Sequence, residues 1–144
     1  MRGVDPYIRV PDGQYRATLV RIETGIVYGQ RRLFGYFQIT EEGPHQGKTL
    51  VRFWNEPRGN FLPRSHNLYR DFVTLIGRRP PSSGLKPEDF LKGCEILVQV
   101  VTVKKGSDGR RMRIQPEDCW YSKIERPIRI TAGCPPCGLP GGTR

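Results

Sequence analysis

Aromatic and arginine side chains alternate in two neighbouring segments of the sequence. In RRLFGYFQIT, Arg32, Phe34 and Tyr36 fall at every second position. In KTLVRFWN, Arg52 and Trp54 do the same. Aromatic rings stack on any base, because every base has a flat π-face, and guanidinium groups neutralise phosphates. These residue types suit single-stranded nucleic acid better than duplex, whose bases are already stacked.

The two-residue period of a β-strand assigns these side chains to faces. In the first segment the apolar set is expected inside the fold: Leu33, Gly35, Phe37 and Ile39. In the second segment we expect Thr49, Val51 and Phe53 inside, and the alternate set outside: Lys48, Leu50, Arg52 and Trp54. The predicted binding surface therefore joins the rings of Phe34, Tyr36 and Trp54. A shift of one residue in either strand would exchange its two faces.

Further basic residues flank the last hairpin that the sequence predicts. They are Lys104, Lys105, Arg110, Arg111 and Arg113. A basic hairpin at this place could hold a phosphate backbone, and the alternative is an ordinary solvated surface. The whole chain has a formal net charge of +10, which makes a polyanion the expected partner.

Four cysteines are the candidate metal ligands. Cys134 and Cys137 form a C-P-P-C pair, and Cys94 and Cys119 could complete a set of four thiolates for zinc. Zinc sequences usually show two close pairs, whereas this chain has one. Burial of Cys94 in a strand is the alternative.

Catalytic patterns are missing from the sequence. His45 and His66 are the only histidines, and both lie among turn residues. The acidic residues occur as adjacent pairs or at element ends, and no phosphate-binding glycine loop or nucleophile elbow is present. We therefore expect a protein that is not an enzyme and has no cofactor.

Length and composition favour one small β domain. The chain has 144 residues, with 17 glycines and 13 prolines, a composition that suits short strands joined by turns. It has no apolar run long enough to span a membrane and no apolar stretch like that of a secretory signal near its start. We expect a cytoplasmic protein, in a bacterial or phage-host cytosol, with no membrane partner.

Periodicity predicts five strands and one helix. The strands are expected over 14–22, 31–40, 48–55, 94–104 and 110–114. The helix is expected over 65–77, with Ser65 as its N-cap and Gly77 at its end. The segment PEDFLKG predicts a single helical turn, and CWYSKIE predicts a short edge strand. Residues 1–12 are expected to form an arm, 13–126 the domain and 127–144 a Gly/Pro-rich tail.

This order, with the helix between the third and fourth strands, is that of the OB-fold. We therefore predict a mainly β protein with a five-stranded OB-fold barrel, a fold that commonly binds oligonucleotides. A β-sandwich with one additional helix is the alternative.

Four segments in this order resemble the small OB-fold single-stranded-DNA-binding proteins of phages and mobile elements. They are GQYRATLV, FGYFQITEEGPHQGKTL, SHNLYRDFVTLIG and FLKGCEILVQVVTVKKGSDG, within residues 13 to 125. The resemblance implies binding of single-stranded DNA in replication or recombination, with little sequence preference. Many proteins of this role end in an acidic tail that recruits partners, whereas the sequence here ends in CGLPGGTR.

Single-stranded DNA is thus the expected partner. Two alternatives stay open, namely an RNA-binding OB module and an assembly protein whose aromatic face contacts another protein. Self-association into a homo-oligomer also stays open.

Overall fold

The computed structural model describes residues 8–27, 29–56, 63–80, 85–108 and 111–133. The protein is mainly β, as predicted. Its elements in chain order are β1 (Gly13–Val27), β2 (Gln30–Ile39), β3 (Thr49–Asn55), α1 (Asn67–Ile76), α2 (Glu88–Leu91), β4 (Glu95–Val103), β5 (Lys105–Asp108), β6 (Arg111–Ile114), the 3-10 helix η1 (Glu117–Cys119) and β7 (Tyr121–Ala132).

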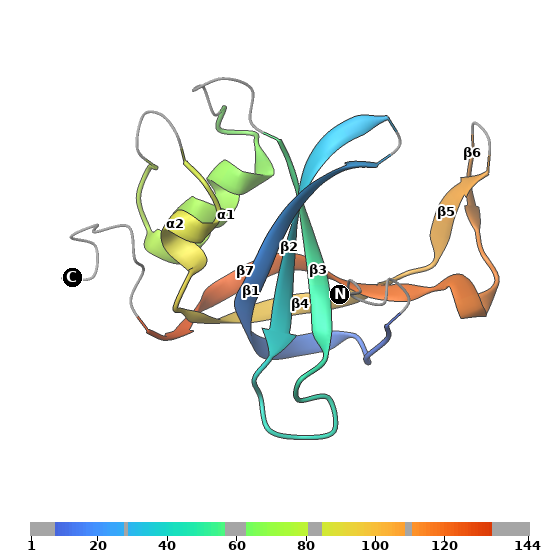
Figure 1. Ribbon diagram of the computed structural model, residues 1–144, viewed down its shortest axis with the longest axis horizontal. Coiled ribbons are helices and arrows are strands. Elements are labelled where there is room, and N and C mark those ends of the chain that lie inside the picture. The colour runs from blue at the N-terminus through green and yellow to red at the C-terminus, as the bar shows by residue number, and fades with distance from the viewer. Residues whose placement is uncertain (1–7, 28, 57–62, 81–84, 109–110, 134–144) are drawn as a thin grey trace.

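Five strands are hydrogen-bonded in a ring in the order β1-β2-β3-β7-β4, and α1 lies between β3 and β4 in the chain (Figure 1). This is OB-like topology, so the predicted fold class is confirmed. Neighbouring strands are antiparallel except β3 and β7, which are parallel and pair only at Val51 and Lys123. The ring therefore closes through its weakest contact, between β3 and β7.

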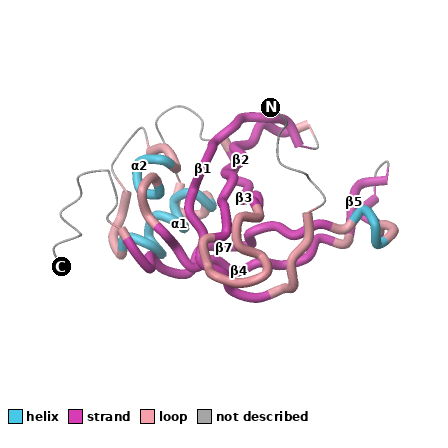
Figure 2. Tube along the Cα trace, turned by 60° about the horizontal axis from the view of Figure 1, so that its bottom comes forward, coloured by secondary structure: helices cyan, strands magenta, loops and turns pink. Residues whose placement is uncertain are grey.

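The core fills the barrel and extends under α1. Both helices lie at one end of the barrel, and the separate β5–β6 hairpin lies at the other (Figure 2). Leu68 and Phe72 of α1 are fully buried, and the Phe72 ring contacts the Phe90 ring of α2 with centroids 5.1 Å apart. The helices thus close the end of the barrel with apolar side chains.

Two strands are longer than the sequence predicted. β1 continues beyond the predicted end at residue 22 and through Gly25, over which the Phe34 ring lies. β7 has 12 residues and pairs with both β4 and β3, so the prediction of a short edge strand is wrong. Since β7 ends at Ala132, residues 127–132 belong to the barrel rather than to the predicted tail.

The start of α1 differs from the prediction by one residue, and its end is as predicted. His66, not Ser65, is the N-cap of α1, because its Nδ1 accepts a hydrogen bond of 3.1 Å from the backbone N–H of Leu68. Gly77 ends the helix in the left-handed conformation, with φ of 87°, as expected.

The described part of the predicted N-terminal arm packs on the barrel. Val10 is buried, and its backbone N–H and carbonyl both bond to the Ser122 hydroxyl. In the described part of the chain, no helix has the length and apolar character needed to cross a membrane.

Candidate nucleic-acid interface

The predicted faces are correct for β2 and wrong for β3. Phe37 and Ile39 point into the core as expected, but so do Leu50 and Trp54, each 1% exposed. The register pairs Phe34 with Phe53 and Tyr36 with Val51, so Phe53 shares the outer face with Phe34. Trp54 therefore does not belong to the outer surface, and Phe53 takes its place.

A glycine in the middle of β2, Gly35, explains why Trp54 of β3 points inward. A Cβ atom on Gly35 would lie 2.5 Å from Cζ3 of Trp54, closer than atoms can pack. A glycine inside a strand often marks such a close approach. The absence of a side chain at position 35 thus makes room for the indole ring inside the barrel.

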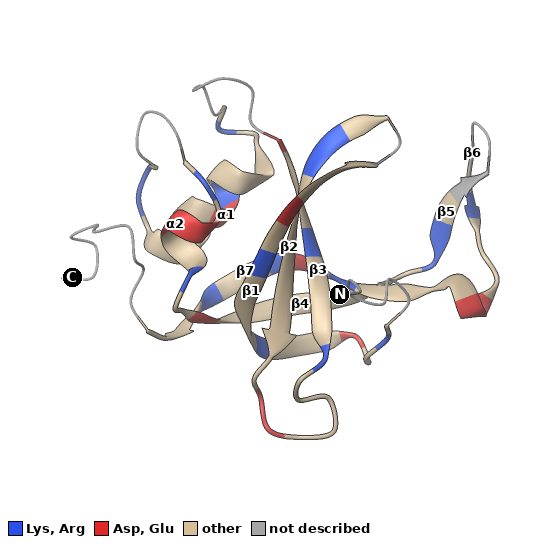
Figure 3. Cartoon of the chain, in the orientation of Figure 1, with Lys and Arg blue, Asp and Glu red and all other residues tan. Residues whose placement is uncertain are grey.

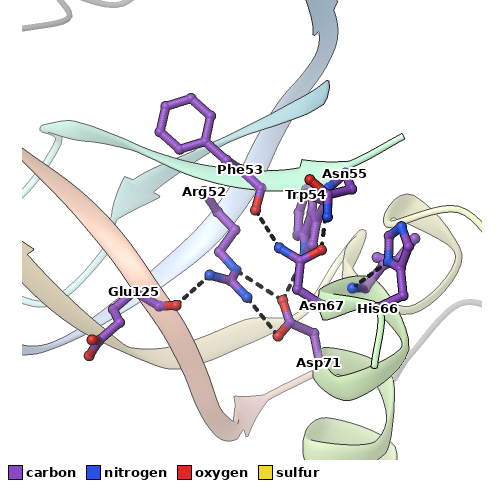
Figure 4. Close-up of polar contacts among 9 residues, drawn as sticks. Arg52, Phe53, Trp54, Asn55, His66, Asn67, Asp71 and Glu125 are labelled. Atoms are coloured by element: carbon purple, nitrogen blue, oxygen red, sulfur yellow. Dashed lines mark hydrogen bonds and ion pairs between the residues drawn. The ribbon is translucent and has the colours of Figure 1, made fainter. Parts of the chain in front are cut away.

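Arg52 also points away from the outer face, into a buried network with Trp54 and Asp71 (Figure 4). Its guanidinium group bonds to both carboxylate oxygens of Asp71, at 3.0 and 2.9 Å, and the Trp54 indole N–H donates to the same carboxylate at 2.7 Å. A third guanidinium nitrogen donates to the backbone carbonyl of Glu125 in β7. The side chain of Arg52 is only 11% exposed.

This network has a structural role. It ties α1, β3 and β7 together where β3 and β7 share one pair of residues. Burial raises the pKa of Asp71, whereas the charge and hydrogen bonds of Arg52 and the indole of Trp54 act in the opposite direction. The predicted positions of Arg52 and Trp54 on a nucleic-acid surface are therefore wrong, because both are occupied in closing the barrel.

The outer aromatic face is formed by Phe34, Tyr36 and Phe53. Each of these side chains is partly exposed, and they come from adjacent strands. The rings of Phe34 and Phe53 meet edge to face, with centroids 5.2 Å apart. In Figure 4 the Phe53 ring points to the opposite side of β3 from Arg52.

Tyr36 is held by two charged residues of β1. The Arg21 guanidinium lies 4.5 Å from the centre of its ring, and its hydroxyl donates to Glu23 at 3.2 Å. Burial and the nearby Glu23 carboxylate raise the pKa of Tyr36, although Arg21 opposes this. The phenol therefore stays neutral and presents a ring whose orientation is fixed.

Three basic residues form a cationic rim around these rings: Arg21, Arg32 and Lys123. Arg21 lies against Tyr36, Arg32 is next but one to Phe34 on β2, and Lys123 is opposite Val51 on β7. Burial lowers the pKa of Lys123, and the charges of Arg52 and Arg32 lower it further, while Glu125 opposes them. Positive groups therefore gather beside the outer aromatic face.

The predicted basic hairpin exists as the two-stranded sheet β5–β6, which projects from the barrel on the same side as the tip of the β1–β2 hairpin (Figure 1). Lysine and arginine residues lie along both projections (Figure 3). Lys104, Lys105 and Arg113 are exposed, and the Lys104 ammonium lies 4.9 Å from the centre of the Trp120 ring. Arg110 lies outside the described residues, and Arg111 is described only by its backbone in β6.

Lys48 lies apart from the rest of the predicted site. It precedes β3, and its ammonium is 3.1 Å from Nδ1 of His45. Arg32 pairs with Asn55 at the other end of β3, which places the two basic residues about 20 Å apart at 3.3 Å per residue.

The proposed set of four zinc-binding cysteines is not formed. Cys94 precedes β4 and is buried, whereas Cys119 precedes β7 at the far end of the same strand pair, where Val103 is opposite Tyr121. Nine residues of strand separate them by about 30 Å, too far for one ion. Cys134 and Cys137 lie outside the described residues, and the described ones include no cluster of three or more histidine, cysteine or acidic residues that could hold a metal.

The sequence interpretation missed three residues of this surface: Phe53, Arg21 and Lys123. The sequence predicts Phe53 on the inner face, and it predicts strands at Arg21 and Lys123 without assigning either residue to the binding surface. The signal for Phe53 was Gly35, since the space that it leaves fixes the register of β3.

Comparison of the sequence with models of protein families and with curated proteins finds no match. The OB-like ring of strands and the position of its outer aromatic face therefore carry the functional interpretation.

Proposed function

We propose that the protein binds single-stranded DNA on its outer aromatic face, with little preference for sequence. The observation that carries this proposal is the grouping of three rings with the cationic rim on the outside of β2 and β3. In OB-folds this face, with the loops beside it, commonly binds oligonucleotides. Each stacked base contributes about 1–3 kcal/mol, whatever its identity.

The contacts among these side chains favour binding. Phe34 and Phe53 support each other edge to face, and Arg21 and Glu23 hold Tyr36. Because the rings are already ordered, stacking a base on them loses little side-chain entropy. The basic β5–β6 hairpin would add contacts to phosphates.

In this proposal the protein is not an enzyme and coats transient single strands, as the resemblance to phage and mobile-element proteins of replication and recombination implies. Its place of action would then be the cytosol of the host cell. The footprint expected for one such fold is about 4–16 nucleotides.

The test is a titration of labelled oligodeoxythymidylate, duplex DNA and RNA at two salt concentrations. We expect the single strand to bind best and its affinity to fall steeply with salt, because counterions are released. The double variant Phe34→Leu/Tyr36→Leu keeps apolar bulk and should lose at least about tenfold in affinity, since each lost stack contributes about 1–3 kcal/mol. Tyr69→Leu, on α1 and outside the three rings and the cationic rim, is the matched control.

Each other outcome has a defined meaning. Equal affinity for duplex and single strand would show that charge alone binds DNA and would contradict stacking. Tighter binding of RNA would favour the RNA-binding alternative. No binding of any nucleic acid would leave the aromatic face as a protein interface.

A further inference from the structure

A polar cleft of about 410 Å³ lies between α1 and β7, away from the rings described above. Arg70 and Thr74 of α1 line one wall, and Arg126 of β7 lines the other. Arg52 lies between these walls, where its own charge is paired with Asp71. The cleft is therefore built on the network that closes the barrel.

The accessible charge in this cleft is positive on balance, because two exposed arginines, Arg70 and Arg126, line it together with one exposed carboxylate, that of Glu125. Arg70 and Arg126 are exposed, and Arg70 is close enough to Asp71 for its charge to act on that carboxylate. The Glu125 side chain points away from Arg52 in Figure 4. Arg70 and Thr74 are four residues apart and so lie on one side of the helix. Two guanidinium groups from opposite walls, with a hydroxyl on the wall formed by α1, are suited to the oxygens of a phosphodiester.

Residues of the cleft adjoin residues of the proposed binding face along the line where β3 meets β7. Lys123 of the cationic rim is opposite Val51, and Arg52 is the next residue of β3. Arg126 is three residues along β7 from Lys123, or about 10 Å. The charge of Arg52 also lowers the pKa of Lys123, after burial, so the positive potential extends along this line.

We propose that this cleft binds backbone phosphates of the same DNA strand after the strand leaves the outer aromatic face. Arg70 and Arg126 would hold one or two phosphates, and the cleft would lengthen the footprint without reading bases. This inference rests on the proposed function.

The test compares labelled oligodeoxythymidylates of about 6 and about 20 nucleotides, lengths chosen to cover one face or to extend beyond it. Arg70→Ala/Arg126→Ala should weaken binding of the long strand at least about fivefold and leave the short strand unchanged. The slope of log affinity against log salt for the long strand should become shallower by about 0.7 if the cleft holds one phosphate and by about 1.4 if it holds two, because each single-strand phosphate contact contributes about 0.7.

Arg78→Ala/Arg79→Ala is the matched control, since it removes two exposed arginines just beyond α1 and outside the cleft. Circular dichroism of both variants checks that they are folded. If the two double variants bind the long strand equally, or if the cleft variant weakens the short strand as much as the long one, the cleft has no such role and the proposed function still stands. If the wild-type protein binds neither strand, the proposed function itself fails, and the role of the cleft fails with it.

Discussion

Aromatic and basic side chains meet on both sides of β3, but the basic groups of the outer side come from the neighbouring strands β1, β2 and β7. On the inner face Arg52 and Trp54 share one acceptor, Asp71; Trp54 and Asp71 are buried, and the Arg52 side chain is mostly buried. On the outer face Phe53 lies beside Phe34, with the cationic rim near them, and the carboxylate that contacts Tyr36 there, that of Glu23, is exposed. An arginine beside an aromatic ring in the sequence therefore does not by itself predict a binding surface. The hydrogen-bond partner of the arginine must also be known.

A carboxylate that is distant in the sequence therefore decides which face of β3 has a structural role. Asp71 is 19 residues from Arg52 and belongs to α1. It makes an inward arginine acceptable, because it supplies both charge and hydrogen bonds to a group that would otherwise be buried unpaired. The other aromatic set is left at the surface, where it can contact a ligand.

The largest effect is expected from removing Asp71, the acceptor that Arg52 and Trp54 share on the inner face. Asp71→Ala leaves Arg52 and the Trp54 indole N–H without their shared partner, and we expect the free energy of unfolding to fall by about 3–5 kcal/mol. Urea denaturation measures this change. Asp118→Ala, at an exposed aspartate of η1, should change stability by less than about 0.5 kcal/mol. A loss as small in Asp71→Ala would show that the network does not hold the barrel closed.

A pair of glycine substitutions applies the same change to each face. Gly35→Ala places a methyl group 2.5 Å from the Trp54 ring inside the barrel, and we expect it to destabilise the fold by about 1–3 kcal/mol. Gly25→Ala places one 3.1 Å from Cζ of the Phe34 ring, at the end of a partly exposed side chain that can shift. Its effect on the melting temperature should be smaller than that of Gly35→Ala, and the reverse order would contradict the assignment of faces.

Substitutions of two neighbouring aromatic residues of β3, Phe53 and Trp54, should affect DNA binding and stability separately. Phe53→Leu removes a ring from the outer face and should lower the affinity for single-stranded DNA by about 1–3 kcal/mol, because one stacking surface is lost. Trp54→Phe should lower the melting temperature and leave the affinity unchanged. Anisotropy titrations and thermal melts of both variants check this, and a loss of affinity in Trp54→Phe alone would reverse the roles.

The fold could be predicted from the sequence because its signals are local. The alternation in CEILVQVVTVK, the left-handed glycine after α1 and the order of the elements each depend on a few neighbouring residues. Which residues of β3 point into the barrel could not be predicted in this way, because KTLVRFWN has apolar residues on both of its faces. Its orientation depends on Gly35 and Asp71, which lie outside the segment.

β7 shows a second limit of sequence reasoning. Pro127 and the charged residues around it resemble a loop, yet Pro127 is opposite Val98 beside an irregularity in the pairing with β4. A proline fits a strand at such a point, because the regular ladder is already interrupted. The position of Lys123 on the surface could be known only after this pairing.

The smallest expected effect concerns His66, which caps the helix that carries Asp71. Burial lowers the pKa of His66 below its ordinary value of 6.5, so the folded protein favours the neutral ring. Its contribution to stability is complete above that value and is lost as the pH falls below it. Between about pH 7.5 and about 5.5 the wild type should lose up to about 1 kcal/mol that His66→Asn, a cap that does not titrate, does not lose. Equal pH dependence in urea denaturation of both proteins would contradict this.

The most direct measurement is an NMR titration of the wild-type protein with oligodeoxythymidylate, in which the aromatic ring signals and the indole N–H signals are followed. Stacked bases should shift the ring signals of Phe34, Tyr36 and Phe53, while the indole N–H of Trp54 stays in place with its bond to Asp71. Binding that moves the Trp54 signal and leaves those three rings unchanged would contradict the proposed face.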